Sequence, residues 1–122
     1  MTINTPYHVA VWGPGDVGSV CIRGAIRRPE LEVVGAYVYG EHKDGVDIGT
    51  LVGKDPVGVA ATGNLAQFLA VDCDVVIYTA LDFPGGPAEQ DFLTLIKAGK
   101  NVITSLPYSY LPARSEDFKQ AL

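Results

Sequence analysis

The chain has 122 residues, of which 48% are hydrophobic and 19% are charged. This composition excludes an intrinsically disordered chain, and the length fits one domain that buries a core without disulfides. The net charge of −5, without a basic stripe along the sequence, argues against nucleic acid or an anionic membrane as a partner.

The cysteines and histidines show no pattern of a metal centre. Cys21 and Cys73 form no Cys-x-x-Cys pair, and His8 and His42 stand at no ligand-like spacing from them. We therefore predict neither a metal site nor a disulfide. No signal peptide is recognised at the start, and no apolar run reaches the about 18 residues of a membrane span. The expected setting is the reducing cytoplasm.

Strand-like and helix-like patterns alternate along the chain. Strands are predicted at residues 8–12, 31–39, 57–62, 74–79 and 101–105, and helices at 17–28, 64–70, 87–98 and 115–122, with a short helical turn near Leu51. The first helix is expected to bury Val17, Val20, Cys21, Ala25 and Ile26. This alternation predicts one α/β domain over residues 1–122, a doubly wound parallel sheet of the Rossmann type. Ligands of such sheets bind at the carboxyl ends of the strands.

A glycine-rich motif follows the first predicted strand and opens the first helix. It consists of Gly13, Pro14, Gly15, Asp16, Val17 and Gly18. In this context Gly13 allows a tight turn, Gly15 lets the backbone approach a pyrophosphate, and Gly18 lets the helix lie close to the sheet. The helix N-terminus offers free N–H groups to phosphates. Dinucleotide binding is favoured over a glycine turn without a ligand.

The end of the second strand bears on the choice between NAD and NADP. An acid there would accept a hydrogen bond from the ribose of NAD, but residues 37–39 contain none. Glu41 could take that role from the following loop, whereas His42 and Lys43 could hold the 2′-phosphate of NADP. The alternative is that all three are solvated loop residues. The pattern slightly favours NADP over NAD.

The loops after the fourth and fifth strands offer polar side chains. The Thr79 hydroxyl could contact the ribose or carboxamide of the cofactor, or be satisfied within its own turn. Asp82 is interpreted as a turn residue, and Ser105 faces the same crevice as Thr79. Tyr108 and Tyr110 are more typical of packing than of catalysis.

Four segments together resemble a known family. VAVWGPGDVG, GEHKDGVDIGTLVG, DVVIYTALDF and AGKNVITS are similar to the N-terminal domain of the dihydrodipicolinate reductase family, with a nearer likeness to its 2,4-diaminopentanoate-dehydrogenase-like branch. The resemblance runs from about Tyr7 to Leu122, and KDGVDIGTLVG is its most specific part. It implies an NAD(P)H-binding domain of an oxidoreductase that acts on a C=N bond, an imine or an amine.

The resemblance also implies roles for single residues. Pyrophosphate binding falls on the glycine motif, adenosine-ribose recognition on Tyr39, Gly40 and Lys43, and contacts on the nicotinamide side on Thr79, Ala80 and Ser105. Family members continue into a second domain that binds the substrate, supplies the catalytic acid and makes oligomer contacts. That domain's paired-His and Lys motif does not occur in residues 1–122, so this chain alone is expected to bind cofactor without turnover. The alternative function is a non-catalytic module of the redox-sensing or coenzyme-A-binding kind.

Overall fold

A four-stranded sheet of parallel strands, in the order β2-β1-β3-β4, forms the centre of the computed structural model, which describes residues 5–108 and 114–121. The strands are β1 (Tyr7–Trp12), β2 (Leu31–Tyr37), β3 (Val75–Tyr78) and β4 (Val102–Thr104). The helices are α1 (Asp16–Ile26), α2 (Ile48–Leu51), α3 (Leu65–Leu69), α4 (Ala88–Lys97) and α5 (Glu116–Ala121). The predicted doubly wound α/β fold is confirmed.

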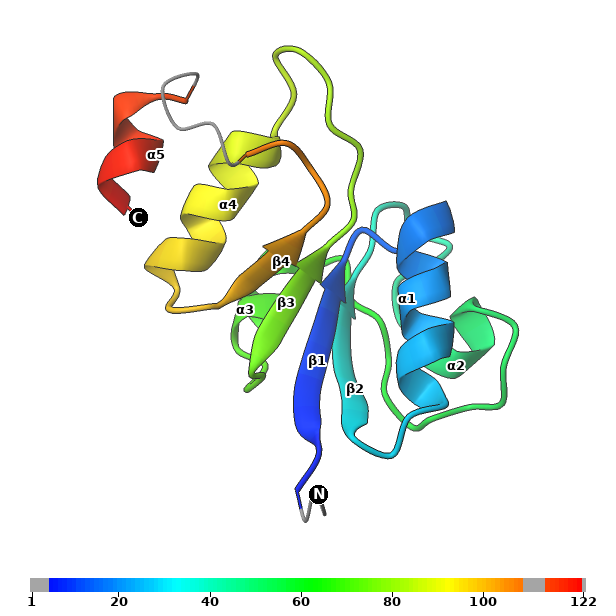
Figure 1. The fold of residues 1–122 in the computed structure, drawn as a ribbon. Helices are drawn as coiled ribbons and strands as arrows, with labels where there is room; N and C mark the ends of the chain where they lie inside the picture. Colours follow the sequence, from blue (N-terminus) through cyan, green and yellow to red (C-terminus); the bar gives the residue numbers. More distant parts are fainter. Residues whose placement is uncertain (1–4, 109–113, 122) are drawn as a thin grey trace.

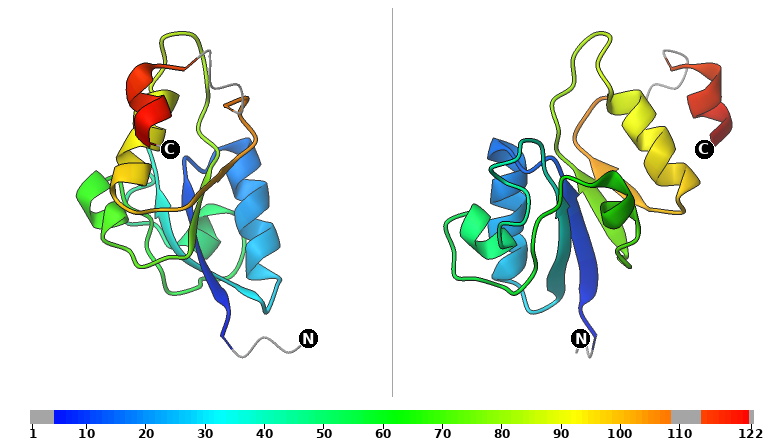
Figure 2. Two further views of the ribbon diagram at one scale, coloured as in Figure 1. Left: turned by 60° about the vertical axis from the view of Figure 1, so that its left-hand side comes forward. Right: turned by 180° about the vertical axis from the view of Figure 1, so that it is seen from behind.

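Helices cover both faces of this sheet. Helices α1 and α2 lie on one face and α3 and α4 on the other, with α5 packed outside α4 (Figures 1 and 2). Successive side chains of β1 point to opposite faces of the sheet and pack into two different hydrophobic clusters, so this strand is buried on both sides. Val11 packs with Ile22 of α1, whereas Trp12 packs with Phe68 and Tyr78 on the opposite face.

The buried face of α1 differs from the predicted one. Its buried residues are Gly18, Ile22 and Ala25, which follow one another at helical spacing. Val17 and Val20 were expected inside, but they are 58% and 60% exposed. The prediction was wrong because the helix is anchored through Gly18, whose missing side chain carried no weight in an apolar pattern.

The predicted strand at 57–62 is also wrong. This segment makes only isolated bridges, from Ala60 to Asp47 and from Thr62 to Tyr37. Its backbone groups are bound mainly to the preceding loop, since Val59 and Ala61 exchange hydrogen bonds with residues 45–48. Gly58 has φ +83°, which interrupts an extended chain. The segment therefore runs beside β2 without becoming a fifth strand.

Asp47 organises this long connection between β2 and α3. One carboxylate oxygen accepts hydrogen bonds from the N–H groups of Gly49 and Val57 at 2.8 and 2.9 Å, and the other accepts one from Gly58 at 2.8 Å. These bonds, that from Val57 foremost, lower the pKa of Asp47. Asp47 lies in the KDGVDIGTLVG segment, so the most specific part of the sequence builds a loop that returns to the sheet.

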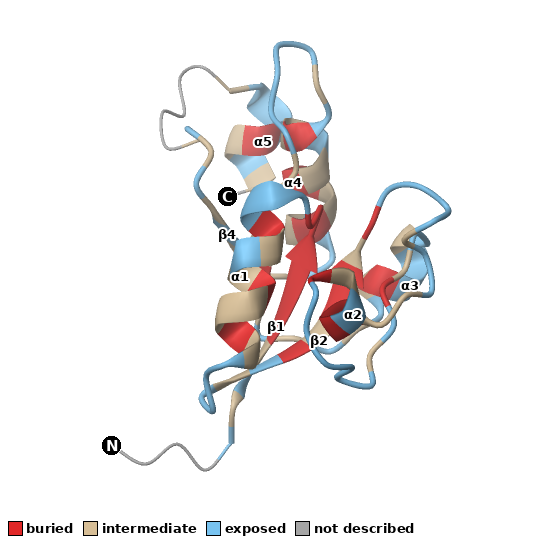
Figure 3. Ribbon diagram, turned by 90° about the vertical axis from the view of Figure 1, so that its right-hand side faces the viewer, coloured by how far each residue is buried: buried red, intermediate tan, exposed pale blue. Residues whose placement is uncertain are grey.

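The strand order brings two loops together. β1 lies next to β3, and both run in the same direction, so the glycine turn after β1 meets the segment after β3. Chain connections leave β1 and β3 toward opposite faces, which is the arrangement that opens a crevice in α/β sheets. The segment after β3 is exposed (Figure 3), unlike the strand that precedes it. Within residues 5–108 and 114–121, no helix has the length and apolarity to cross a membrane.

Candidate functional site

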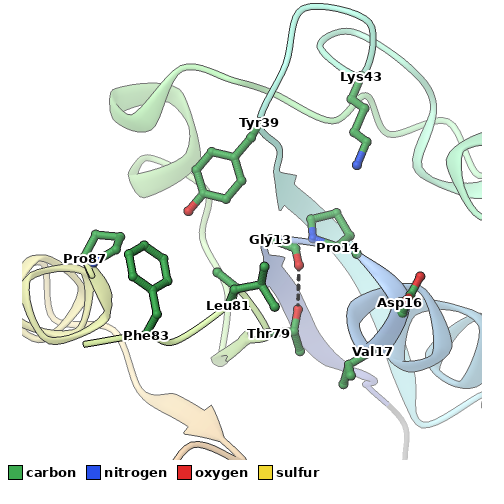
Figure 4. A pocket seen from close by; sticks show the side chains of 12 residues that line it. Gly13, Pro14, Asp16, Val17, Tyr39, Lys43, Thr79, Leu81, Phe83 and Pro87 are labelled. Atoms are coloured by element: carbon green, nitrogen blue, oxygen red, sulfur yellow. Dashed lines mark hydrogen bonds between the residues drawn. The ribbon is translucent and has the colours of Figure 1, made fainter. Parts of the chain in front are cut away.

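A cavity of about 610 Å³ lies at the carboxyl ends of β1 and β3. Three segments line it: the glycine turn, the loop after β2 and the segment between β3 and α4 (Figure 4). Nine of the predicted site residues lie there, namely Gly13, Pro14, Gly15, Asp16, Val17, Tyr39, Lys43, Thr79 and Ala80. The structure thus brings together residues that are up to 67 positions apart in the chain.

The glycine turn is built tightly at its start and openly at its middle. Gly13 has φ +78°, and a Cβ there would lie 2.8 Å from the Cβ of Ala80, so a side chain is excluded twice. A Cβ on Gly15, by contrast, would meet no atom within 4 Å. The backbone at Gly15 therefore faces open space on the cavity side.

Helix α1 begins at this opening. Its N-cap is Gly15, and no side chain caps its first N–H groups. These groups have no partner inside the helix and carry the positive end of its dipole. With Gly15 and Asp16 exposed at the cavity wall, the helix start can receive an anionic ligand such as a pyrophosphate.

Tyr39 forms one side wall of the cavity. Its hydroxyl oxygen accepts a hydrogen bond from Nε1 of the buried Trp12 at 2.7 Å, and its ring stacks edge-on against Tyr37. Partial burial raises the pKa of Tyr39, and the bond from Trp12 offsets this only in part. Because indole N–H can only donate, the phenol proton of Tyr39 stays available for a ligand.

Lys43 extends over the glycine turn from the same loop. Its side chain points toward the side of the cavity where Pro14 and Asp16 lie (Figure 4). The turn that carries it is closed by a hydrogen bond from its N–H to the carbonyl of Gly40 at 3.2 Å. Gly40 itself has φ +90° and shapes this turn without lining the cavity. Glu41 and His42 are exposed and line no part of it.

Two more predicted residues lie outside the cavity lining. Gly18 is buried one turn into α1, beneath the glycine turn. Ser105 follows β4, which is separated from β1 by β3, and its side chain is exposed. A role for Ser105 at the cofactor thus stays a prediction that the cavity geometry does not support.

Sequence reasoning missed Leu81, Phe83 and Pro87, which form the apolar wall across from Tyr39. Leu81 and Phe83 are 83% and 56% exposed. Large apolar side chains in a segment rich in Gly and Pro, which cannot contribute to a strand or helix, were the available signal. Such side chains suit the flat face of an aromatic ring system.

Tyr108 serves packing, as the sequence indicated. Its ring lies edge-on to Phe92 and Phe118, and the guanidinium of Arg114 stacks on it 4.2 Å from the ring centre. Tyr110 lies outside the described residues. Within those residues, no three His, Cys, Asp or Glu side chains gather as a metal site would need.

The comparison with protein families decides where this chain belongs. Residues 7–103 match the family described as "Dihydrodipicolinate reductase, N-terminus". The chain belongs to this family. The resemblance read from the sequence is thereby confirmed at the level of the family, and the fold is that of NAD(P)-binding oxidoreductase domains. Its 2,4-diaminopentanoate-dehydrogenase-like branch stays a prediction.

One relative is an amine dehydrogenase of Streptomyces virginiae, 32% identical over 100 residues, which are 80% of this chain and 28% of the relative. Among solved structures, an amine dehydrogenase from Mycobacterium smegmatis has a TM-score of 0.79 at 22% identity, over 97% of this chain and 36% of its own. The chain thus spans about a third of the length of these proteins.

Two further similar structures hold cofactors. GenD2 from gentamicin A biosynthesis, in complex with NAD, has a TM-score of 0.65 at 24% identity, over 85% of this chain and 28% of its own. Biliverdin reductase from Synechocystis sp. PCC 6803, in complex with biliverdin and NADP+, has a TM-score of 0.70 at 17% identity, over 96% of this chain and 34% of its own. The same fold therefore serves either cofactor.

Proposed function

We propose that this chain binds NADP(H) in the cavity between the glycine turn and the segment after β3. The observation that carries the proposal is the uncapped start of α1 at Gly15, open to a cavity that also has an apolar wall. The pyrophosphate would lie at the helix start, and the adenine between Tyr39 and the wall formed by Phe83 and Pro87. NADP(H) then supplies hydride chemistry when it is bound.

Lys43 supports NADP over NAD. Among the described residues that line the cavity it is the only Lys or Arg, and it extends over the glycine turn. Its ammonium can meet a 2′-phosphate, whereas no acid of the loop after β2 lines the cavity to receive a ribose hydroxyl. Asp16 is the first residue of α1 and lines the cavity at the helix start, where the phosphates would lie.

We further propose that the protein acts in an oxidoreductase on an amine or on the corresponding C=N bond. The similarity to two proteins named amine dehydrogenase supports this substrate class. The residues between Thr79 and Phe83 that line the cavity carry no acid or base. This chain then binds and orients the cofactor, and the substrate-binding groups come from a further domain.

The substitution Gly15→Val tests the binding site. A Cβ at Gly15 would meet no protein atom within 4 Å, so we expect the fold to tolerate valine, whose side chain would occupy the approach to the helix start. We expect the thermal midpoint to stay close to that of the wild type and the Kd for NADPH to rise at least about 100-fold.

Gly24→Val is the matched control. Gly24 lies in the same helix, also with no atom within 4 Å of a Cβ, but outside the cavity. Calorimetric titration should show nearly wild-type NADPH binding for Gly24→Val. Equal affinities of Gly15→Val and the wild type would overturn the proposed site.

A further inference from the structure

Thr79 joins the two sides of the cavity. It follows β3 directly, and its hydroxyl lies 2.9 Å from the carbonyl oxygen of Gly13 and 3.2 Å from that of Trp12 (Figure 4). Its backbone N–H also donates to Trp12 at 2.9 Å. The hydroxyl proton is therefore engaged by the glycine turn. The predicted contact of Thr79 with the ribose or carboxamide of a cofactor would have to use the hydroxyl oxygen as an acceptor.

Gly18 completes the same contact from below. A Cβ on Gly18 would lie 2.5 Å from Oγ1 of Thr79, and next 3.2 Å from the carbonyl oxygen of Gly13. The nearest obstacle to a side chain at the third glycine of the motif is therefore the Thr79 hydroxyl. The two nearest neighbours of that missing side chain are the partners of one hydrogen bond, and the third, Cβ of Pro14, lies 3.4 Å away.

We infer that Thr79 is a positioning residue, which holds the glycine turn in its binding conformation, and that Gly18 lacks a side chain to admit the Thr79 hydroxyl. The inference rests on the proposed function. Gly13 has no Cβ, so its backbone dihedral angles are less restricted than those of other residues, and here φ is +78°. Both peptide groups of Gly13 are held: its N–H donates to the carbonyl oxygen of Tyr37, and its carbonyl oxygen accepts from the hydroxyl of Thr79.

The consequence for binding follows from the neighbouring bond. The N–H of Gly15 donates back to the carbonyl of Gly13 at 2.8 Å, so the orientation of that carbonyl sets the shape of the turn up to the helix start. Without the Thr79 hydroxyl the turn gains alternative orientations, and a ligand must select the competent one. The apparent affinity then equals the intrinsic affinity multiplied by the fraction of molecules in the competent conformation.

The experiment compares Thr79→Val with Thr79→Ser in the 122-residue chain. Calorimetric titration with NADPH is carried out well below the thermal midpoint of each variant. We expect the Kd to rise about tenfold for Thr79→Val, which keeps the shape and loses the hydroxyl, and to stay within about twofold for Thr79→Ser. Thr94→Val is the control, since it loses a hydroxyl bond of 3.0 Å to Gln90 in α4, outside the cavity.

The pairing of Thr79 with Gly18 has its own readout, which needs no cofactor. Gly18→Ala should lower the thermal midpoint of the wild type. In a Thr79→Ala background the same change should lower the midpoint less, because the 2.5 Å contact with the Thr79 hydroxyl is gone and the 3.2 Å contact with the Gly13 carbonyl oxygen remains. Alanine also favours a helix over glycine. This measurement also applies if Thr79→Val does not fold.

The outcomes separate the two proposals. A wild-type chain that binds no NADPH overturns the proposed function. If the wild type binds, the positioning role alone fails when Thr79→Val binds within about twofold of it, when Thr79→Ser is as weak as Thr79→Val, or when Thr94→Val weakens binding equally. Equal loss of midpoint on Gly18→Ala in both backgrounds overturns the pairing.

Discussion

We expect a single side chain, that of Lys43, to distinguish NADP(H) from NAD(H). Lys43 is an ammonium on a flexible stem that extends over the glycine turn, and a phosphate on the ribose would sit within its reach. Replacing it removes a charge that only one of the two cofactors uses. We expect Lys43→Ala to raise the Kd for NADPH about tenfold and to change that for NADH by less than about twofold.

Lys54→Ala is the control for Lys43, because it removes the same charge from the same connection between β2 and α3 but outside the cavity. Titrations of both variants with both cofactors give four affinities. Equal losses of NADPH and NADH affinity in Lys43→Ala would exclude a discriminating role.

A partly buried pair on the face of the sheet covered by α3 and α4 is expected to stabilise the fold in a pH-dependent way. The hydroxyl of Tyr78, a residue 1% exposed, donates to Asp91 at 2.6 Å. Burial raises the pKa of Asp91, and the bond from Tyr78 opposes that rise. At neutral pH the pair therefore consists of a partly desolvated carboxylate and the donor that supports it.

We expect Tyr78→Phe to lower the free energy of unfolding by about 2 kcal/mol at pH 7, because the Asp91 carboxylate loses its donor. This loss of unfolding free energy should be smaller at about pH 4, because the raised pKa leaves more of Asp91 neutral there. Tyr37→Phe is the control, since the Tyr37 hydroxyl makes no hydrogen bond to the described residues. Denaturant unfolding at both pH values measures this, and a loss independent of pH would contradict it.

Among single residues, the sequence predicted those that act through their backbone. The places of Gly13 and Gly15 in the turn could be predicted from the motif, because their proposed function needs only a missing side chain after a strand. Leu81 and Phe83 could not, because an exposed apolar residue in a turn has no periodic pattern. The bond from Thr79 to Gly13 joins positions 66 apart, and no local rule reports such a contact.

Among the elements, the connection between β2 and α3 depends most on one side chain. Asp47 binds four backbone N–H groups, at both ends of a loop that passes through α2. Asp47→Ala should lower the thermal midpoint and loosen residues 48–58, as hydrogen exchange of their amides would show. Asp55→Ala, in the same loop, is the control.

The pH dependence of this contribution has a definite sign. The folded state lowers the pKa of Asp47, so its stabilisation is fully present above the unfolded pKa of about 3.9 and is lost as the pH falls through the folded value. The difference in thermal midpoint between the wild type and Asp47→Ala should therefore be constant around neutral pH and should shrink as the pH falls into the acid range. A difference that stays the same in acid would refute the role of the charge.

Strands and helices with a strong apolar pattern could be predicted from the sequence. A segment whose backbone hydrogen bonds are taken up by other parts of the chain could not. The buried strands β1 and β3, and α4 with Pro87 before it, agree with the sequence to within one or two residues. The segment 57–62 reads as a strand locally, but its backbone groups are bound by residues 45–48 and by Asp47. A local apolar pattern does not contain that competition.

For the whole molecule, the alternation of strands and helices was enough to predict a parallel sheet with its ligand site at the carboxyl ends. The neighbourhood of β1 and β3 turns three loops into one cavity. The chain's place in the dihydrodipicolinate reductase family agrees with that architecture. The substrate could not be predicted, because the residues between Thr79 and Phe83 that line the cavity carry no acid or base to act on one.

We expect the cavity to be a nicotinamide dinucleotide site, and a single comparative titration can show whether it is. The 122-residue chain is titrated calorimetrically with NADPH, NADH and coenzyme A under the same conditions. We expect saturable binding of NADPH, weaker binding of NADH and no heat from coenzyme A. Binding of coenzyme A alone, or of none of the three, would contradict it.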